Sequence, residues 1–177
     1  VLFWDKDIRL GRYLEEEGLH LYNSSQAIAL SDDKSLTHLE LYRHGIPMPK
    51  TYIAPFTFGP IGYTNYTFLD EVKAALGLPC VVKECFGSFG QQVYLAETAQ
   101  ELLEITRRIG SKPMLFQEFI ESSKGRDVRL QVVGDRIVAS MYRYSDTDDF
   151  RANITNGGKM KPYAPSEDEI QLALSSC

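Results

Sequence analysis

Apolar residues recur at helical or strand spacing along most of the 177-residue chain. Apolar positions three and four residues apart predict helices, and short β-branched or aromatic runs between turn residues predict strands. The expected helices cover residues 6–17, 31–45, Phe68–Leu76, 98–110 and a last stretch from Ser166. The expected strands cover residues 19–22, Thr51–Ile53, 80–85, 93–95, 114–120, 127–133 and Arg136–Tyr144. This mixture predicts an α+β fold.

Several element ends carry local signals. Thr98 and Glu101 have the spacing of a capping box, which predicts a helix start. Ser31 is the expected N-cap of the 31–45 helix, whose apolar face Leu36, Leu39 and Tyr42 would supply. The dipeptide Gly134-Asp135 suits a type II′ turn between the last two strands. Residues 145–165 are polar and glycine-rich, so we expect a long loop able to contact a substrate. Residues 55–66 form another loop, to which the sequence assigns no role.

A lysine stands inside one of the predicted strands. Because side chains alternate along a strand, Lys83 shares a face with Val81 and Cys85. A lysine buried there without a partner is costly, so an anionic group is expected to meet it. The following loop, residues 87–90, has two glycines and can bring backbone N–H groups close to a ligand. The alternative is an ordinary hairpin whose lysine reaches solvent.

Composition narrows the function classes. The formal net charge of −5 argues against a general nucleic-acid binder, although arginines gather within residues 126–151. Three cysteines without a C-x-x-C pair predict neither a disulfide framework nor a zinc site, which fits a reducing cytosol. No apolar run is long enough to span a bilayer, and no signal peptide opens the chain. Since Val1 is not an initiator methionine, we expect that the chain begins inside a longer protein or has been processed. The three histidines show no ligand spacing.

The order of these pieces resembles the ATP-grasp ligases, most closely the RimK-like branch that ligates glutamate to a carboxylate. Nearly the whole chain takes part in the resemblance. The matching segments are Asp33-Lys34, Gly45-Ile46-Pro47-Met48-Pro49, Val81-Val82-Lys83, Gly87-Ser88-Phe89-Gly90, Gln117-Glu118-Phe119-Ile120, Asp127-Val128-Arg129, Val133-Gly134-Asp135, Phe150-Arg151-Ala152-Asn153 and Gly157-Gly158.

The resemblance implies an ATP-grasp fold in which two α+β lobes enclose a nucleotide. Residues 1–30 would be the tail of a preceding α/β domain, and residues 31–177 the ATP-grasp domain. The implied activity is a carboxylate–amine ligase: ATP phosphorylates a carboxylate, and an amine then attacks the acyl phosphate. The implied partners are ATP, a carboxylate acceptor (a small molecule or a protein C-terminal tail) and the amine of glutamate or a similar amino acid. Neither nucleic acid nor membrane is expected, the location would be the cytoplasm, and a homo-oligomer is left open.

The resemblance also implies roles for individual residues. Lys83 would contact phosphates, and residues 87–91 would be a mobile flap over them. Gln92 stands where the family often has another glycine. Lys34 is left open between a phosphate contact and a surface lysine. The remaining implied contacts are, for the flap, Gly87, Ser88 and Gly90; for the adenine hinge, Gln117, Glu118 and Phe119; for the ribose, Asp127; and for phosphate or carboxylate, Arg129, Arg143, Arg151 and Asn153.

Two of these expectations depend on features that the sequence leaves open. In a regular hairpin Arg143 lies on the face opposite Asp127, whereas a bulge puts both on one face. The family's ligands for Mg²⁺ (or Mn²⁺) would lie beyond Cys177. Acidic candidates within the chain are Glu118, Asp127, Asp148 and Asp149, of which the last two are interpreted as solvated. A non-catalytic, nucleotide-binding regulatory module that has lost its metal site is therefore the alternative.

Overall fold

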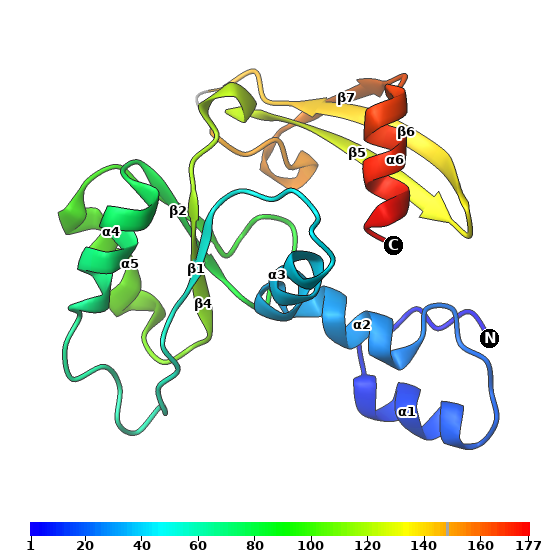
Figure 1. Ribbon diagram of the computed structural model, residues 1–177, viewed down its shortest axis with the longest axis horizontal. Helices are drawn as coiled ribbons and strands as arrows, with labels where there is room; N and C mark the ends of the chain where they lie inside the picture. Colours follow the sequence, from blue (N-terminus) through cyan, green and yellow to red (C-terminus); the bar gives the residue numbers. More distant parts are fainter. Residues whose placement is uncertain (148) are drawn as a thin grey trace.

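Two antiparallel sheets form the frame of the computed structural model, which describes residues 1–147 and 149–177 with the side chain of Asn156 left aside. The strand order is β1-β4-β2-β3 in the first sheet and β5-β6-β7 in the second. The strands are β1 Thr51–Ile53, β2 Cys80–Glu84, β3 Val93–Ala96, β4 Met114–Glu118, β5 Arg126–Val133, β6 Arg136–Tyr144 and β7 Lys159–Pro162. Each sheet with its helices makes one lobe (Figure 1). The predicted α+β class is therefore confirmed.

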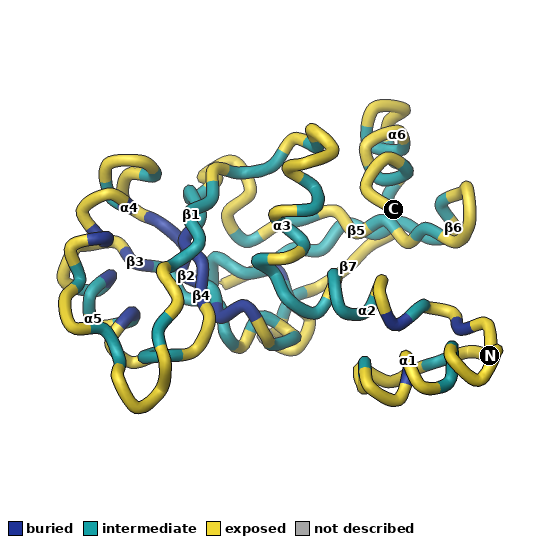
Figure 2. Tube along the Cα trace, turned by 60° about the horizontal axis from the view of Figure 1, so that its bottom comes forward, coloured by how far each residue is buried: buried dark blue, intermediate teal, exposed yellow. Residues whose placement is uncertain are grey.

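The main hydrophobic core lies between the first sheet and two helices, α4 (Phe68–Leu76) and α5 (Ala99–Ile109), which cover one of its faces (Figure 1). Val82 and Phe116 are register partners on β2 and β4, and both are fully buried against Val72 and Leu102 of the helices. Figure 2 shows this burial along β2 and β4. Because side chains alternate along strands, the neighbours of Val82 and Phe116 must point to the opposite face.

The opposite face lies beside α3 (Lys34–Arg43), and here one predicted helix is wrong. Residues 31–45 do not form a single helix capped by Ser31. Residues Ser25–Asp32 form α2, and a new helix begins after Asp33. Asp33 has an extended backbone, and its carboxylate accepts hydrogen bonds from the N–H groups of Ser35 and Leu36. A carboxylate at the positive end of α3 is a strong N-cap, so the chain breaks there.

The N-terminal segment departs from prediction in a second place. The helix expected at residues 6–17 is present as α1 (Ile8–Glu16), capped by Asp7 and packed on α2. The strand expected at residues 19–22 is absent from the described structure; an isolated bridge joins Leu2 to Tyr22 instead. A strand needs consecutive paired residues, and a single bridge is too little pairing to make one. The expected apolar face of α3 remains largely exposed, with Leu36, Leu39 and Tyr42 40%, 48% and 72% accessible.

The second sheet begins with the predicted hairpin. Gly134, at a φ of 63°, occupies the first position of the two-residue turn between β5 and β6. The register shifts between Gln131 and Val132, so a bulge is present and Asp127 lies directly opposite Arg143. The 145–165 segment is not one long loop, since it contains the 3-10 turn η2 (Ile154–Asn156) and β7, which pairs with β6. Helix α6 (Glu167–Ser175) packs on β5 and β6 (Figure 1).

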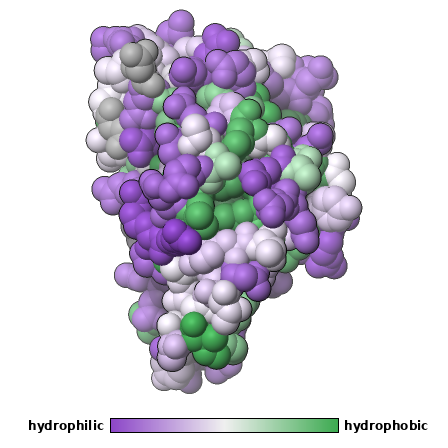
Figure 3. Space-filling model, turned by 90° about the vertical axis from the view of Figure 1, so that its left-hand side faces the viewer, coloured by the Kyte–Doolittle hydropathy of each residue, from purple (hydrophilic) through white to green (hydrophobic). Residues whose placement is uncertain are grey.

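A single covalent connection, residues 119–125 with the 3-10 turn η1 (Glu121–Ser123), leads from the first sheet into the second. The 55–66 loop lies at the far end of the first lobe, where Phe56, Phe58 and Ile61 are exposed. Figure 3 shows their apolar surface at the narrow lower end of the molecule. Among the described residues, no helix has the length and apolar character needed to cross a membrane.

The capping box of α5 yields a first prediction. The Thr98 hydroxyl accepts a hydrogen bond from the N–H of Glu101, and the Glu101 carboxylate accepts one from the N–H of Thr98. Thr98→Ala should lower the free energy of unfolding by about 1 kcal/mol, measured by urea denaturation. Thr67→Ala is a matched control, since Thr67 precedes α4 but makes no capping bond. Equal losses for the two variants would contradict the capping role.

Candidate functional site

Lys83 projects from the face of the first sheet that α4 and α5 leave free. Its Nζ donates a 2.6 Å hydrogen bond to Oε1 of Gln117 on β4. Nε2 of Gln117 in turn donates to the Thr51 hydroxyl on β1, at 2.9 Å. These three polar side chains thus cross three strands of the sheet. No carboxylate within the described part of the chain forms an ion pair with Lys83, so the expected anionic partner is not a protein side chain there.

The environment of Lys83 disfavours its charge. Burial lowers the pKa of Lys83, and the nearby charge of Lys34 lowers that pKa further. Burial also lowers the pKa of Lys34. The charges of Asp32 and Asp33 favour the charged form of Lys34, but no described carboxylate forms an ion pair with either lysine. An anion placed between Lys83 and Lys34 would stabilise both charges.

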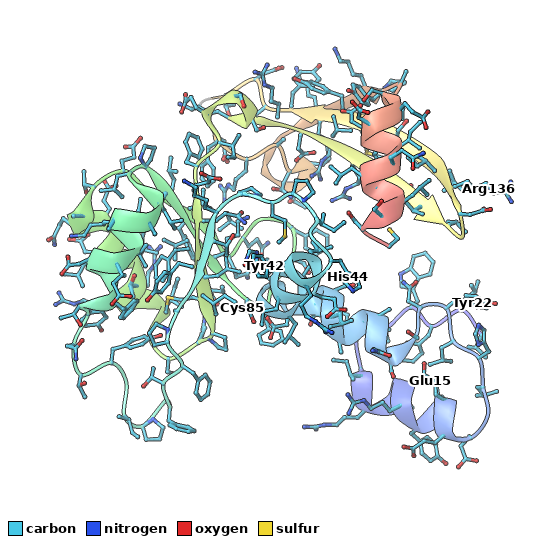
Figure 4. The ribbon with its side chains drawn as sticks, in the orientation of Figure 1. Glu15, Tyr22, Tyr42, His44, Cys85 and Arg136 are labelled. Atoms are coloured by element: carbon cyan, nitrogen blue, oxygen red, sulfur yellow. The ribbon has the colours of Figure 1, made fainter. Side chains whose placement is uncertain are left out.

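Lys34, at the first position of α3, is tied to the end of β2. Its N–H donates to the carbonyl of Cys85, and its Nζ donates to the carbonyls of Cys85 and Gly87 at 3.1 and 3.0 Å. Figure 4 shows Cys85 beside the start of α3. Lys34 is therefore not a freely solvated surface lysine: it connects the helix start to the beginning of the glycine loop.

In the loop of residues 87–91, which we call the flap, the backbone carbonyls and the backbone N–H groups differ in their hydrogen bonding. Side chains donate to its carbonyls: Lys34 to Gly87, Thr155 to Phe89 and Arg151 to Gly90. The N–H groups of residues 87–90, in contrast, find no acceptor among the described residues. Consecutive free N–H groups form a concavity that binds anions. The flap can therefore bind phosphate oxygens through its backbone.

Two residues of the flap, Phe89 and Gly87, have unusual backbone conformations. Phe89 has a φ of 61°, a left-handed conformation that is strained for a bulky residue and costs on the order of 1–3 kcal/mol. Gly87 has a φ of 136°, and a Cβ there would meet Oε1 of Gln92 at 2.2 Å. That amide oxygen is buried and has no hydrogen-bond partner in the described structure. The Gln92 side chain thus packs against Gly87, and the φ of 136° at Gly87 is a conformation that residues other than glycine rarely adopt.

Arg151 reaches the flap from the other lobe. Its Nη1 donates to the Gly90 carbonyl at 2.9 Å. Nε and Nη2 bind the two carboxylate oxygens of Asp149 at 3.0 and 2.9 Å, and the Arg151 N–H donates to the same carboxylate. These bonds lower the pKa of Asp149 and raise that of Arg151. The interpretation of Asp149 as a solvated side chain is wrong, because it anchors the guanidinium.

The bulge in the hairpin brings Asp127 and Arg143 together. Nε and Nη2 of Arg143 each donate to one oxygen of Asp127 at 2.7 Å, and the Arg143 side chain is only 12% exposed. The bulged alternative is therefore the correct one. Arg129 lies two residues along β5 on the same face; it is exposed and forms no ion pair with a described residue. Arg129 is thus free to meet a ligand, whereas Arg143 is committed to Asp127.

The residues expected to form the hinge lie where β4 ends. The Glu118 carboxylate accepts a 2.7 Å hydrogen bond from the N–H of Lys50, so it closes the end of β1. Phe119 lies between the lobes and contacts the ring of Phe150 edge-on, at a centroid distance of 6.4 Å. Ser88 accepts a hydrogen bond from Lys6. Asn153, half-buried before η2, makes no side-chain hydrogen bond to a described residue.

The described residues do not assemble a metal site. No group of three metal-ligating side chains occurs among them. The carboxylates of Glu118, Asp127 and Asp149 are each engaged by a protein donor, as given above. Asp148, the fourth acidic candidate, lies outside the described residues. The described residues thus present cationic and N–H groups suited to an anion, but no cluster of free oxygen ligands for a divalent cation.

Two side chains that the sequence did not single out, Thr155 and Thr51, belong to this arrangement, and Asp149 takes part in it as an anchor that the sequence did not predict. The alternation of Asp149 and Arg151 two residues apart was a usable signal, because an Asx-type turn brings such a carboxylate onto the following N–H groups. Thr155 and Thr51 offered no signal, since their partners lie 66 positions away in the sequence.

Comparison with known proteins agrees with this geometry. Residues 31–177 match the family model of the RimK-like ATP-grasp domain. A beta-citrylglutamate synthase B from Danio rerio is 37% identical over 174 residues, which cover 98% of this chain and 42% of that protein. A probable alpha-L-glutamate ligase from Cellvibrio japonicus (strain Ueda107) is 36% identical over 168 residues, 93% of this chain and 53% of that protein. The chain thus spans about half the length of these curated relatives.

The fold has solved counterparts. A RimK domain ATP-grasp protein from Sphaerobacter thermophilus superposes with a TM-score of 0.67 and 22% sequence identity, over 97% of this chain and 58% of that one. The resemblance drawn from the sequence motifs is confirmed by both kinds of comparison. The chain belongs to the RimK-like ATP-grasp family.

Proposed function

We propose that this chain is the nucleotide-binding part of an ATP-dependent ligase that forms an amide bond between a carboxylate and the amine of glutamate or a similar amino acid. Its membership of the RimK-like family supports this proposal. So do the names of two relatives, a beta-citrylglutamate synthase and a probable alpha-L-glutamate ligase.

The observation that carries the proposal is the half-buried Lys83. Its charge is disfavoured by burial and by Lys34, and no described carboxylate compensates it. A nucleotide triphosphate supplies the missing negative charge. In our proposal Lys83 holds phosphate oxygens as a point charge, Lys34 adds its positive field, and the free N–H groups of the flap complete the cradle.

The remaining residues take roles that their positions permit. We assign the adenine edge to the backbone at Gln117, Glu118 and Phe119, where β4 leaves the sheet. Asp127, oriented by Arg143, would accept hydrogen bonds from the ribose hydroxyls. Both oxygens of Asp127 already accept from Arg143, yet a carboxylate has about four lone-pair sites, so acceptor capacity is left.

Catalysis would depend on positioning and charge. The acceptor carboxylate attacks the γ-phosphoryl group and ADP leaves. The amine then attacks the acyl phosphate, and the amide forms as phosphate leaves and the amine loses a proton. Arg129, Arg151 and Asn153 would face the γ-phosphoryl group and the substrate carboxylate, where a planar guanidinium can bind two oxygens at once. Holding the reactants together and neutralising the charge on the transferring group would supply the rate enhancement. No enzyme nucleophile is needed for these steps.

A divalent cation, Mg²⁺ or Mn²⁺, completes the proposal but not within the described residues. Their carboxylates are engaged by arginine or backbone donors, so they do not fit a metal site. We propose that the metal ligands lie beyond Cys177 in a longer protein, of which residues 1–30 would be the tail of a preceding α/β domain. The acceptor in this proposal is a small molecule or a protein C-terminal tail. We place the reaction in the cytoplasm.

A regulatory module that binds nucleotide without catalysis is the second candidate. The observation that favours it is the lack of a metal-ligand cluster among the described residues. The two candidates agree on ATP binding and differ on turnover by the complete protein.

ATP binding is tested through Lys83→Met, which removes the charge and keeps the apolar stem. A charge-assisted hydrogen bond contributes about 1.5–3 kcal/mol, so we expect ATP affinity to fall roughly ten- to hundredfold in calorimetry. Lys73→Met on the outer side of α4 is the matched control and should leave the affinity unchanged. Unaltered ATP binding by a folded Lys83→Met protein would remove Lys83 from the site.

The role of Arg151 is tested in the full-length protein. Arg151→Ala should lower kcat about a hundredfold or more, with a small effect on the KM for ATP, because its contact forms chiefly as charge develops on the phosphoryl group. Arg136→Ala, at the exposed hairpin tip in Figure 4, is the control and should keep its rate. An Arg151→Ala enzyme that keeps kcat and merely needs more ATP would show that the assignment is wrong.

The location of the metal ligands is tested with the 177-residue chain itself. Incubated with ATP, Mg²⁺ and glutamate, this chain should bind ATP weakly and release no ADP. The full-length protein should release ADP when both carboxylate and amine are present. Sustained ADP release by the 177-residue chain would place a metal site within it, and a full-length protein that binds ATP but never turns over would support the regulatory module.

A further inference from the structure

The flap is fastened to the opposite lobe by a residue that has no assigned role. The Thr155 hydroxyl donates a 3.0 Å hydrogen bond to the carbonyl of Phe89, at the flap tip. Thr155 lies in η2, directly after the 150–153 segment that carries Arg151 and Asn153. The neighbouring flap carbonyl, that of Gly90, accepts from Arg151. Two adjacent carbonyls of the first lobe are therefore bound by side chains of one short segment of the second.

The conformation of Phe89 gives an independent reason to regard this contact as consequential. Phe89 has a left-handed backbone, while its side chain is 66% exposed and gains little by packing. A strained backbone persists where surrounding contacts over-determine it. The hydrogen bond from Thr155 to the Phe89 carbonyl holds this strained peptide from outside the flap.

We propose that Thr155 is a positioning residue that latches the flap to the 150–155 segment, so that flap closure and the placement of Arg151 occur as one movement. This inference rests on the proposed function, in which the flap covers the phosphates and Arg151 meets the γ-phosphoryl group. Thr155 acts on the reaction through these groups and does not itself touch the nucleotide.

Thr155 suits this task better than Arg151 does. The Arg151 guanidinium has donors on both Asp149 and the Gly90 carbonyl, so turning toward a phosphoryl group means releasing at least one of these acceptors. The Thr155 hydroxyl has no such second obligation among the described hydrogen bonds. It can keep hold of Phe89 while Arg151 exchanges partners, and the flap then stays attached to the segment during the chemical step.

The latch is tested first without nucleotide, by backbone hydrogen exchange of the chain and two variants. Thr155→Val keeps the shape and removes the hydroxyl; Thr155→Ser keeps the hydroxyl. The loss of one hydrogen bond corresponds to about a two- to tenfold population change. Exchange of the Gln91 amide, the flap N–H that donates to the Ser88 carbonyl, should therefore accelerate by that factor in Thr155→Val. Thr155→Ser should restore the original rate, and the amides of α5 should exchange alike in all three proteins.

A second arm adds ATP and asks whether the two segments respond together. In the unaltered chain, ATP should slow exchange both at residues 88–92 and at residues 150–157. In Thr155→Val it should still slow exchange in the flap, but the protection of residues 150–157 should be reduced at least twofold. Parallel protection of both segments in Thr155→Val would overturn the coupling.

The two arms separate failure of the latch from failure of the proposed function. Flap exchange that is the same in Thr155→Val as in the unaltered chain, without nucleotide, overturns the latch whatever ATP does. If ATP protects no segment of the unaltered chain, nucleotide binding by the flap is wrong, and the nucleotide-free comparison then decides the latch on its own.

Discussion

The alternation of side chains along β2 is the constraint on which the site depends. Val82 is fully buried in the core between the sheet and its two helices, so the next residue must point to the other face. A shift of the strand register by one residue would place the ammonium of Lys83 in the core and Val82 on the opposite face of the sheet. Packing of the core on one face of the sheet therefore fixes the position of Lys83 on the other.

Hydrogen bonds to the flap carbonyls hold the flap in a conformation that suits an anion. Its carbonyls are bound by Lys34, Thr155 and Arg151, which come from α3 and from the second lobe. With these carbonyls engaged, the N–H groups of residues 87–90 are left without an acceptor among the described residues. A loop free of such donors would sample both orientations, and a phosphate would have to order it on binding. The side chains around the flap thus supply part of the order that nucleotide binding requires.

The sequence predicted the features that depend on neighbours in the chain and missed those that depend on distant partners. The Thr98 capping box, the Phe68–Leu76 helix and the Gly134-Asp135 turn are local, and all three are present. The strand at residues 19–22 failed because pairing, not propensity, decides whether a strand forms. Strand β7 was overlooked because its alternation is hidden in lysine and proline, residues that suit an edge strand. The helix break at Asp33 shows a strong cap overriding a continuous helical pattern.

Charge balance links the location of the metal ligands to the binding of nucleotide. Each described acidic candidate already compensates a cation or a backbone dipole: Asp149 holds Arg151, Asp127 holds Arg143, and Glu118 closes β1. Releasing Asp149 or Asp127 to a metal ion would leave the guanidinium of Arg151 or Arg143 without its ion-pair partner, and an unpaired, partly buried charge is costly. Lys83 and Lys34, in contrast, have no described carboxylate partner. This surface is therefore complementary to the negative charge of an anion, whereas these three carboxylates are not free to act as ligands of a divalent cation.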